Sequence, residues 1–167
     1  DSNTGTAVSG GGAYVYNASP TFINCTFSQN GDATVQGGGI CIAGTGTTTL
    51  YNCILWDDRA NPAYNQELVE VPGDTATFSV TYSDVQQEGV YPGVGNINQY
   101  PVFADSDPYY HLESISPCID QGTSAVPGGL PATDIDGDPR EVGTVDMGAD
   151  EYFDQPTPGD YYVNITS

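Results

Sequence analysis

Short runs of alternating apolar and polar residues recur along the first half of the chain, separated by glycine, proline or asparagine. The segment GGGAYV at 10–15 returns as GGGICI at 37–42, and FINCTF at 22–27 returns as LYNCIL at 50–55. A fainter third copy, VTYSDV, lies at 80–85. Alternation with a period of two is typical of β-strands, and these copies show no helical periodicity. We therefore expect short strands and no helices in this region.

The spacing of the copies predicts how the strands are arranged. Self-similarity at a period of roughly 20–50 residues is typical of solenoids, whose successive coils stack on one another. We predict an all-β fold, with a short right-handed parallel β-helix of about three coils over residues 1–90. The clear coils are 10–36 and 37–58, and a third spans about 66–90 after a polar insertion at 57–65.

The sequence changes character from about residue 91. Proline, aspartate and glycine cluster at 105–108, 127–129 and 136–139, which is typical of tight turns. Residues 91–155 are therefore predicted to form a turn-rich C-terminal cap, folded beside or over the last coil. An extended tail, consisting of a linker and a β-prone run, is expected at 156–167.

Stacking of equivalent positions explains two further features. Cys25 and Cys53 share a repeat position, and neighbouring parallel strands lie about 4.8 Å apart, within disulfide range. We favour an unbridged stack of small apolar side chains. Asn24 and Asn52 precede them and can form a ladder of side-chain amides, which Tyr82 ends in the third coil. The glycine triplets permit positive φ and close backbone packing at a corner.

The charge of the chain restricts its partners. Among 167 residues, 22 are acidic and only Arg59 and Arg140 are basic, giving a net charge of −20. This balance argues against nucleic acid or an anionic membrane as a partner and favours divalent cations. A general acidic bias of a salt-adapted source is an alternative explanation. No apolar run approaches the roughly 20 residues that cross a bilayer, so no membrane-spanning segment is expected.

Several motifs of the second half follow one another in a specific order: YHL at 110–112, SPCIDQG at 116–122, DIDGDPR at 134–140 and DMGADE at 146–151. Together with the repeats, they resemble secreted bacterial β-helix proteins that carry a module of the choice-of-anchor Q type. The resemblance covers roughly residues 10–152 and implies a right-handed parallel β-helix on a secreted or cell-surface protein. It implies little about activity, because fold and function are separable.

The acidic loop near residue 136 is a candidate metal site. Asp134, Asp136 and Asp138 alternate around a glycine, a plausible oxygen cage for Ca²⁺, although the spacing is not that of an EF-hand. The alternative is structural: Arg140 pairs with one of the acids at 146–151, and the aspartates cap turns.

Catalysis is not expected. A polysaccharide lyase needs a base and a cation for the uronate, and the chain has no lysine and only Arg59, Arg140 and His111. His111 is expected to be a packed structural residue. A glycosidase needs two carboxylates at a suitable separation, and no pair of acids recurs on one predicted face. Binding or cleavage of carbohydrate by a secreted β-helix domain is the alternative function.

Three N-x-S/T sequons make Asn17, Asn24 and Asn164 candidate acceptors for covalent glycans. They are unequal. Pro20 follows the first sequon and is unfavourable for its use. Asn24 is also a candidate ladder residue, and an amide in a ladder cannot carry a glycan. Asn164 is expected to be accessible.

A β-helix of three coils has open strand edges at both ends, which invite pairing with another chain. A contact between copies that does not close generates a helical filament. In the tail, Tyr161, Tyr162, Val163 and Ile165 belong to a β-prone run that can add a strand to the next subunit, and residues 1–9 are the other candidate donor. The sequence therefore predicts a structural subunit of an extracellular fibre, with a fragment of a longer surface protein as the other interpretation.

Overall fold

The computed structural model describes residues 10–31, 37–58, 67–104 and 109–153, and all structural statements below concern these residues. Within them the chain forms short strands and no helix. The strands are β1 (Ala13–Tyr16), β2 (Thr21–Ile23), β3 (Thr26–Ser28), β4 (Ile40–Ala43), β5 (Thr47–Tyr51), β6 (Ile54–Trp56), β7 (Leu68–Glu70), β8 (Thr77–Thr81) and β9 (Asp84–Val85).

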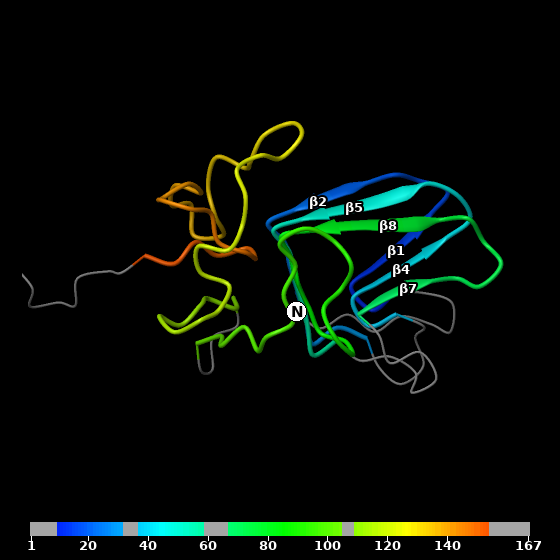
Figure 1. Ribbon diagram of the computed structural model, residues 1–167, viewed down its shortest axis with the longest axis horizontal. Helices are drawn as coiled ribbons and strands as arrows, with labels where there is room; N and C mark the ends of the chain where they lie inside the picture. Colours follow the sequence, from blue (N-terminus) through cyan, green and yellow to red (C-terminus); the bar gives the residue numbers. More distant parts are fainter. Residues whose placement is uncertain (1–9, 32–36, 59–66, 105–108, 154–167) are drawn as a thin grey trace, which may run out of the picture.

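Within the described residues the strands pair with strands of neighbouring coils, and β9 also forms a parallel bridge from Asp84 to Ile97. They make three parallel sheets, ordered β1-β4-β7, β2-β5-β8 and β3-β6-β9 (Figure 1). Each sheet takes one strand from each coil, and the register follows the sequence repeat, so that Phe22 pairs with Leu50 and Leu50 with Val80. The predicted parallel β-helix of three coils is confirmed.

The corners between the sheets explain why asparagine recurs in the repeat. Asn24, Asn52 and Tyr82 occupy the same corner in successive coils, with φ of 48°, 52° and 48°. Asparagine adopts this left-handed conformation more readily than most residues, because its short side chain can form local hydrogen bonds. The corner thus combines a backbone requirement with the opportunity for an amide ladder.

The glycine triplets serve close packing alone. Gly11 and Gly38 do not have a positive φ, unlike Gly31 and Gly44. The expectation that the triplets allow positive φ is therefore wrong, whereas the expectation of close backbone packing is correct. A Cβ atom on Gly11 would lie 2.4 Å from the backbone oxygen of Gly38, so only glycine lets successive coils approach this closely.

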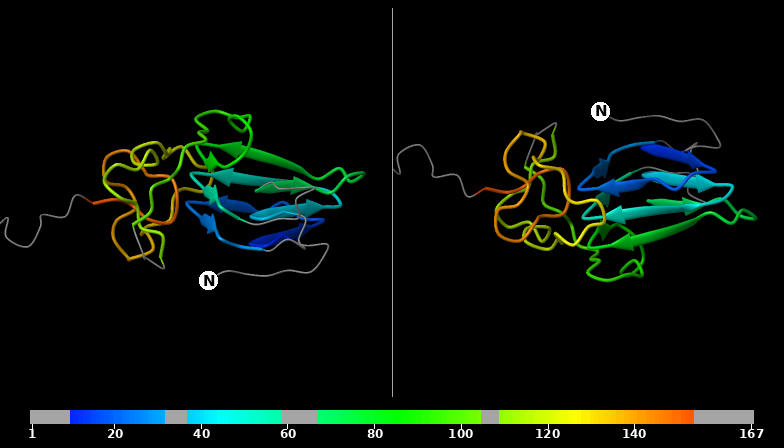
Figure 2. Two further views of the ribbon diagram at one scale, coloured as in Figure 1. Left: turned by 90° about the horizontal axis from the view of Figure 1, so that it is seen from below. Right: turned by 90° about the horizontal axis from the view of Figure 1, so that it is seen from above.

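The C-terminal part lies beside the coils and does not cover their end (Figure 2). This side module, residues 99–104 and 109–153, packs on the outer face of the sheet β3-β6-β9. Ile54 of β6 is fully buried there against Leu112, Cys118 and Met147, in a second apolar cluster separate from the interior of the coils. Most of the predicted cap therefore lies beside the coils, whereas its first residues, 91–98, lie over the last coil.

Candidate functional site

The interior of the coils is less well covered at the first coil than elsewhere. Leu50 and Leu55 of the second coil are both 0% exposed, and Val80 of the third is 3% exposed. The equivalent side chains of the first coil, Phe22 and Phe27, are only partly buried. Their rings meet edge to face with centroids 5.5 Å apart. The first coil therefore presents part of the apolar core at its surface.

The backbone of the first coil is also open. Among the described strands, β1, β2 and β3 each have a neighbour on one side only. The Pro20 carbonyl and the Asn24 N–H bond to Thr49 and Tyr51 across β5. Because successive residues of a strand point their backbone groups to opposite edges, Thr21 directs its N–H and C=O away from β5. This edge can accept another strand.

The end of the third coil differs, because an end loop (residues 86–98) lies over it (Figure 2). Tyr91 of this loop packs against the core. Asn96 donates from Nδ2 to the Val80 carbonyl oxygen over 2.9 Å and accepts the Ser83 N–H over 3.0 Å. The two ends of the stack are therefore not equivalent.

Side chains at the same position of successive coils form apolar rows inside the coils. One of these rows ends in a charged side chain at the third coil. Glu70 takes the position that Ile42 has in the second coil. Its Oε1 accepts the Phe78 N–H over 3.1 Å. Such a row is poorly suited to continue into another coil, because stacking would bury the carboxylate.

Of the residues predicted to take part in assembly, Tyr161, Tyr162, Val163 and Ile165 lie outside the described residues. So does the candidate acceptor Asn164. Asn17 is exposed, which makes its side chain accessible to modification. Its Oδ1 accepts the Thr45 N–H over 3.1 Å, and this bond does not use Nδ2, the atom that would carry a sugar.

The environment of Asn24 contradicts its prediction as a glycan acceptor. Its side chain is 6% exposed. Nδ2, the atom that would carry the sugar, donates to the carbonyl oxygens of Asp146 and Gly148 over 2.9 and 3.3 Å. Its Oδ1 accepts from Asn52, as expected of a ladder. The ladder is confirmed, and it also attaches the side module to the coils.

The predicted calcium cage is not formed. Oδ1 of Asp134 accepts the N–H groups of Asp136 and Asp138 over 3.0 and 2.9 Å, and Oδ2 accepts the Glu151 N–H over 3.2 Å. Asp134 is thus a turn cap, and the three carboxylates do not converge on one point. The physical reason is that backbone amides already bind both oxygens of Asp134: two amides of the turn bind Oδ1, and that of Glu151 binds Oδ2.

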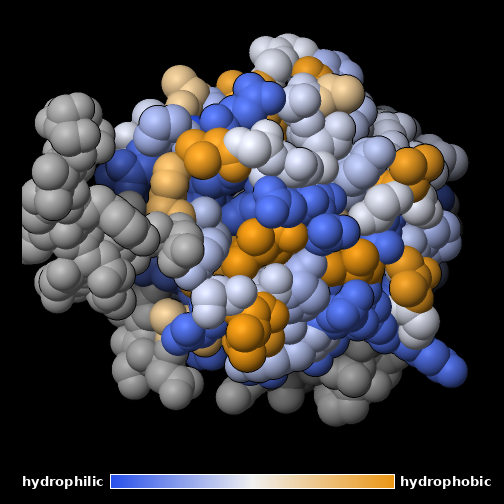
Figure 3. Space-filling view, turned by 60° about the vertical axis from the view of Figure 1, so that its left-hand side comes forward, coloured by the Kyte–Doolittle hydropathy of each residue, from blue (hydrophilic) through white to orange (hydrophobic). Residues whose placement is uncertain are grey.

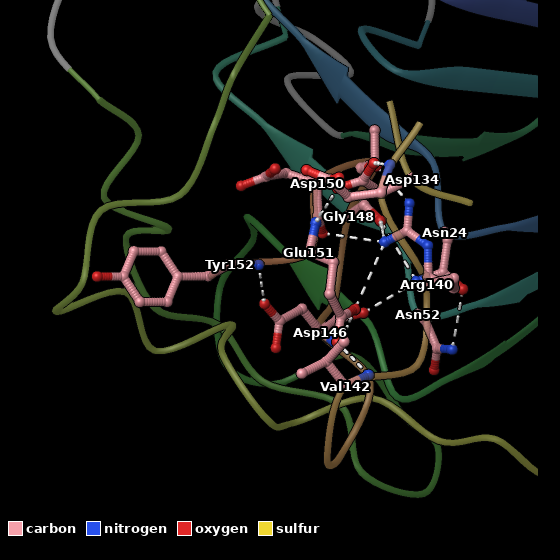
Figure 4. A network of polar contacts seen from close by, with 12 residues as sticks. Asn24, Asn52, Asp134, Arg140, Val142, Asp146, Gly148, Asp150, Glu151 and Tyr152 are labelled. Carbon is pink, nitrogen blue, oxygen red and sulfur yellow. Dashed lines mark hydrogen bonds and ion pairs between the residues drawn. The ribbon is translucent and has the colours of Figure 1, made fainter. Parts of the chain in front are cut away.

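Arg140 is the centre of a buried network that joins parts of the side module (Figure 4). Its guanidinium lies 3.7 Å from the Glu151 carboxylate and donates to the carbonyl oxygens of Asp150 and Ala149. Burial raises the pKa of Glu151 to about 7, although the nearby Arg140 lowers it. This structural network agrees with the alternative interpretation of the acidic loop.

A different set of metal-ligating side chains is brought together. His111 Nε2 lies 3.0 Å from Asp136 Oδ2. Asp150 completes a group whose ligand atoms all lie within 4.8 Å of one another. His111 is therefore paired with a carboxylate and partly exposed, unlike the packed residue that was expected. No spacing rule could reveal this group, because its members come from three separate turns.

A pocket of about 460 Å³ lies at the seam between the first coil and the side module. Coil residues on its wall are Thr26, Ser28 and Asn30. Those of the side module include Tyr109 and Ile135, so the wall combines hydroxyl, amide and aromatic groups.

The cysteines are all free thiols. Cys25 and Cys53 form the unbridged stack that was predicted. The pKa of Cys25 is lowered to about 7, chiefly by a hydrogen bond from the Cys53 thiol, whereas burial raises the pKa of Cys53.

Residues 1–91 match the protein-family model described as right handed beta helix region. The match covers more than half of the chain and includes all of the described strands. No curated protein and no solved structure matched the chain. Within the part of the chain that the structure describes, no helix is long and apolar enough to cross a membrane.

Proposed function

Because this chain belongs to the right-handed β-helix family, we propose that it is a non-catalytic structural subunit of an extracellular assembly, in which the first coil accepts a strand from a second copy. The main support is the contrast in burial between the partly exposed Phe22 and Phe27 and the fully buried Leu50 and Leu55. The extracellular location rests on the resemblance of the side module to secreted proteins.

The difference between the two ends favours strand donation over direct stacking of coils. A head-to-tail stack would require the third coil of one copy to contact the first coil of the next. The end loop and Glu70 occupy that position. A donated strand needs only the open edge of the first coil.

The donor we propose is the tail run at 161–166 of a neighbouring copy. It alternates in β-prone residues and carries no charged side chain, although the whole chain has a net charge of −20. An uncharged strand can therefore approach the edge of an acidic neighbour with little repulsion. The side module offers a less suitable contact, because its apolar residues are divided by polar ones on the face seen in Figure 3.

Light scattering and electron microscopy of the full chain over a range of concentrations test this proposal. We expect concentration-dependent filaments, which removal of residues 156–167 should abolish. Removal of residues 1–9 should leave them intact. Filaments that form equally well without the tail, or a monomer at every concentration, would overturn the proposal.

A substitution at the receiving edge provides the matched test. Thr21→Pro removes an N–H that points away from β5 and should weaken assembly. Thr21→Ala keeps that N–H and should assemble like the unchanged chain. An equal loss of assembly in both variants would mean that assembly depends on the Thr21 side chain and not on the backbone N–H at the open edge.

A specific observation favours carbohydrate binding as a second candidate function. Tyr109 and Tyr110 line the pocket beside hydroxyl and amide groups. Aromatic rings with nearby polar groups suit the apolar faces and hydroxyls of sugars. A glycan array probed with the tail-deleted chain tests this function separately from assembly, and binding that Tyr109→Ala removes would support it.

A further inference from the structure

The cluster of His111, Asp136 and Asp150 has the composition and spacing of a metal site. We propose that these three side chains bind a divalent transition-metal ion of the Zn²⁺ type. The imidazole and carboxylate atoms all lie within 4.8 Å of one another, and the closest pair, His111 Nε2 and Asp136 Oδ2, are 3.0 Å apart.

These distances are close to what one ion requires. Zinc binds histidine nitrogen and carboxylate oxygen at roughly 2.0–2.2 Å, so ligand atoms around it lie about 3–3.5 Å apart. The pair of His111 and Asp136 already meets this spacing. Their side chains are 31% and 52% exposed, although the Nε2 atom of His111 is itself buried, so the imidazole has to shift to close on an ion held by Asp150.

Two of the ligands are held in place by neighbouring groups, as metal ligands usually are. Oδ2 of Asp150 accepts the Leu112 N–H over 2.8 Å, and this carboxylate is buried beside the backbone that carries His111. The Asp134 carboxylate fixes the turn that carries Asp136, by accepting the N–H of that residue. The same bonds that prevent the predicted calcium cage therefore prepare this site.

The ligand set selects the class of ion. Calcium prefers six to eight oxygen ligands, whereas an imidazole nitrogen suits zinc and similar metals. The local charge also favours a cation, because the cluster joins two carboxylates to one imidazole. A bound divalent ion would relieve the repulsion between these carboxylates.

The site borders the pocket at the seam. Tyr109 lines the pocket, and its ring centroid lies 6.0 Å from that of His111. Ile135, which precedes Asp136, lines the same wall. Because the protein supplies three ligands, coordination positions are left for water or for an oxygen of a molecule in the pocket.

Calorimetric titration of the full chain with Zn²⁺, after treatment with a chelator and its removal, tests the site. We expect one Zn²⁺ per chain, with Ca²⁺ much weaker. Asp136→Asn should lower the affinity for Zn²⁺ at least tenfold. This residue is exposed, so the variant should fold, which circular dichroism can verify.

Asp138→Asn is the matched control. It makes the same change of charge two residues away in the same turn, outside the cluster. It should bind Zn²⁺ as tightly as the unchanged chain, whereas His111→Gln should resemble Asp136→Asn. Absence of Zn²⁺ binding, or an equal loss in the variants at 136 and 138, would overturn the proposal, the latter by showing only general attraction to an acidic surface.

Discussion

The side-chain amide of Asn52 donates a hydrogen bond to Oδ1 of Asn24 over 3.2 Å, which joins the same corner of two successive coils. Asn52 also binds the backbone of Thr123 in both directions: Nδ2 donates to its carbonyl oxygen and Oδ1 accepts its N–H, each over 2.9 Å. One fully buried side chain thus connects two coils and the side module.

Asn52→Ala should lower the free energy of unfolding by more than any exposed asparagine variant. It leaves backbone groups of Thr123 and the Asn24 oxygen without their partner, and each buried group left unpaired costs about 1–3 kcal/mol. Asn17→Ala is the control, because Asn17 has a similar left-handed φ of 51° but is exposed. It should lose the backbone preference, about 1–2 kcal/mol, and one solvent-exposed hydrogen bond from the Thr45 N–H, but no buried partner. Urea unfolding measures both, and equal losses would contradict the importance of the ladder.

Gly38→Ala should be severely destabilising. The new Cβ would lie 2.7 Å from the backbone oxygen of Asp58, so the two segments would have to separate. We expect a loss of roughly 3 kcal/mol or more, at the upper end of overpacking effects. Gly128→Ala is the control for packing: nothing lies within 4 Å of its Cβ position, so it adds only the strain of a side chain at a left-handed φ of 91°, about 1–2 kcal/mol. Thermal unfolding should show a much smaller change there, and a comparable change would contradict the close packing of coils.

Stability should fall as the pH rises from about 5 to 9, and Glu67 should contribute to this. Burial, with the nearby Asp58, raises the pKa of Glu67 from 4.5 to about 10. Between these values the folded state keeps a proton that the unfolded state releases, so folding is favoured at low pH and weakened as the pH rises. Unfolding by urea at several pH values measures how the free energy of unfolding changes with pH.

Glu67→Gln should flatten this dependence, because the amide imitates the protonated acid without titrating. Glu88→Gln removes an exposed acid and provides the control of equal charge change. It should keep the slope of the unchanged chain. The assignment to Glu67 would be wrong if both variants had the same pH dependence.

Cys25 should be the first thiol to react with iodoacetamide in the folded protein. Its pKa of about 7 gives a large thiolate fraction at pH 8, and it is only partly buried. Cys41 is buried and its pKa is raised to about 11. Peptide mapping by mass spectrometry after brief labelling distinguishes them. Faster labelling of Cys41 would contradict the description of the thiol stack.

The coils could be predicted because their contacts follow the sequence period. Phe22 and Leu50 occupy the same repeat position and pair in the structure. The asparagine ladder was predictable for the same reason, since Asn24 and Asn52 also share a repeat position. A periodic pattern determines which residues meet, because every coil has the same path.

The side module could not be predicted in this way. His111, Asp136 and Asp150 meet through turns of different lengths, and no period relates them. Of the two roles predicted for Asp134, the turn cap is correct, but the sequence could not decide between them, because it lists carboxylates and not the backbone amides that compete for them. The contacts of the end loop could not be predicted for a similar reason: Asn96 closes the third coil through hydrogen bonds that no repeat specifies.

The ladder has a consequence for how the chain folds. The amide of Asn24 binds the carbonyl oxygens of Asp146 and Gly148, which are synthesised more than a hundred residues later. Contacts of such long range slow folding, because the intervening chain must be ordered before they form. The coils of a newly made chain therefore expose one unfinished flank until residues 146–148 have left the ribosome. Premature truncation would leave that flank permanently uncovered.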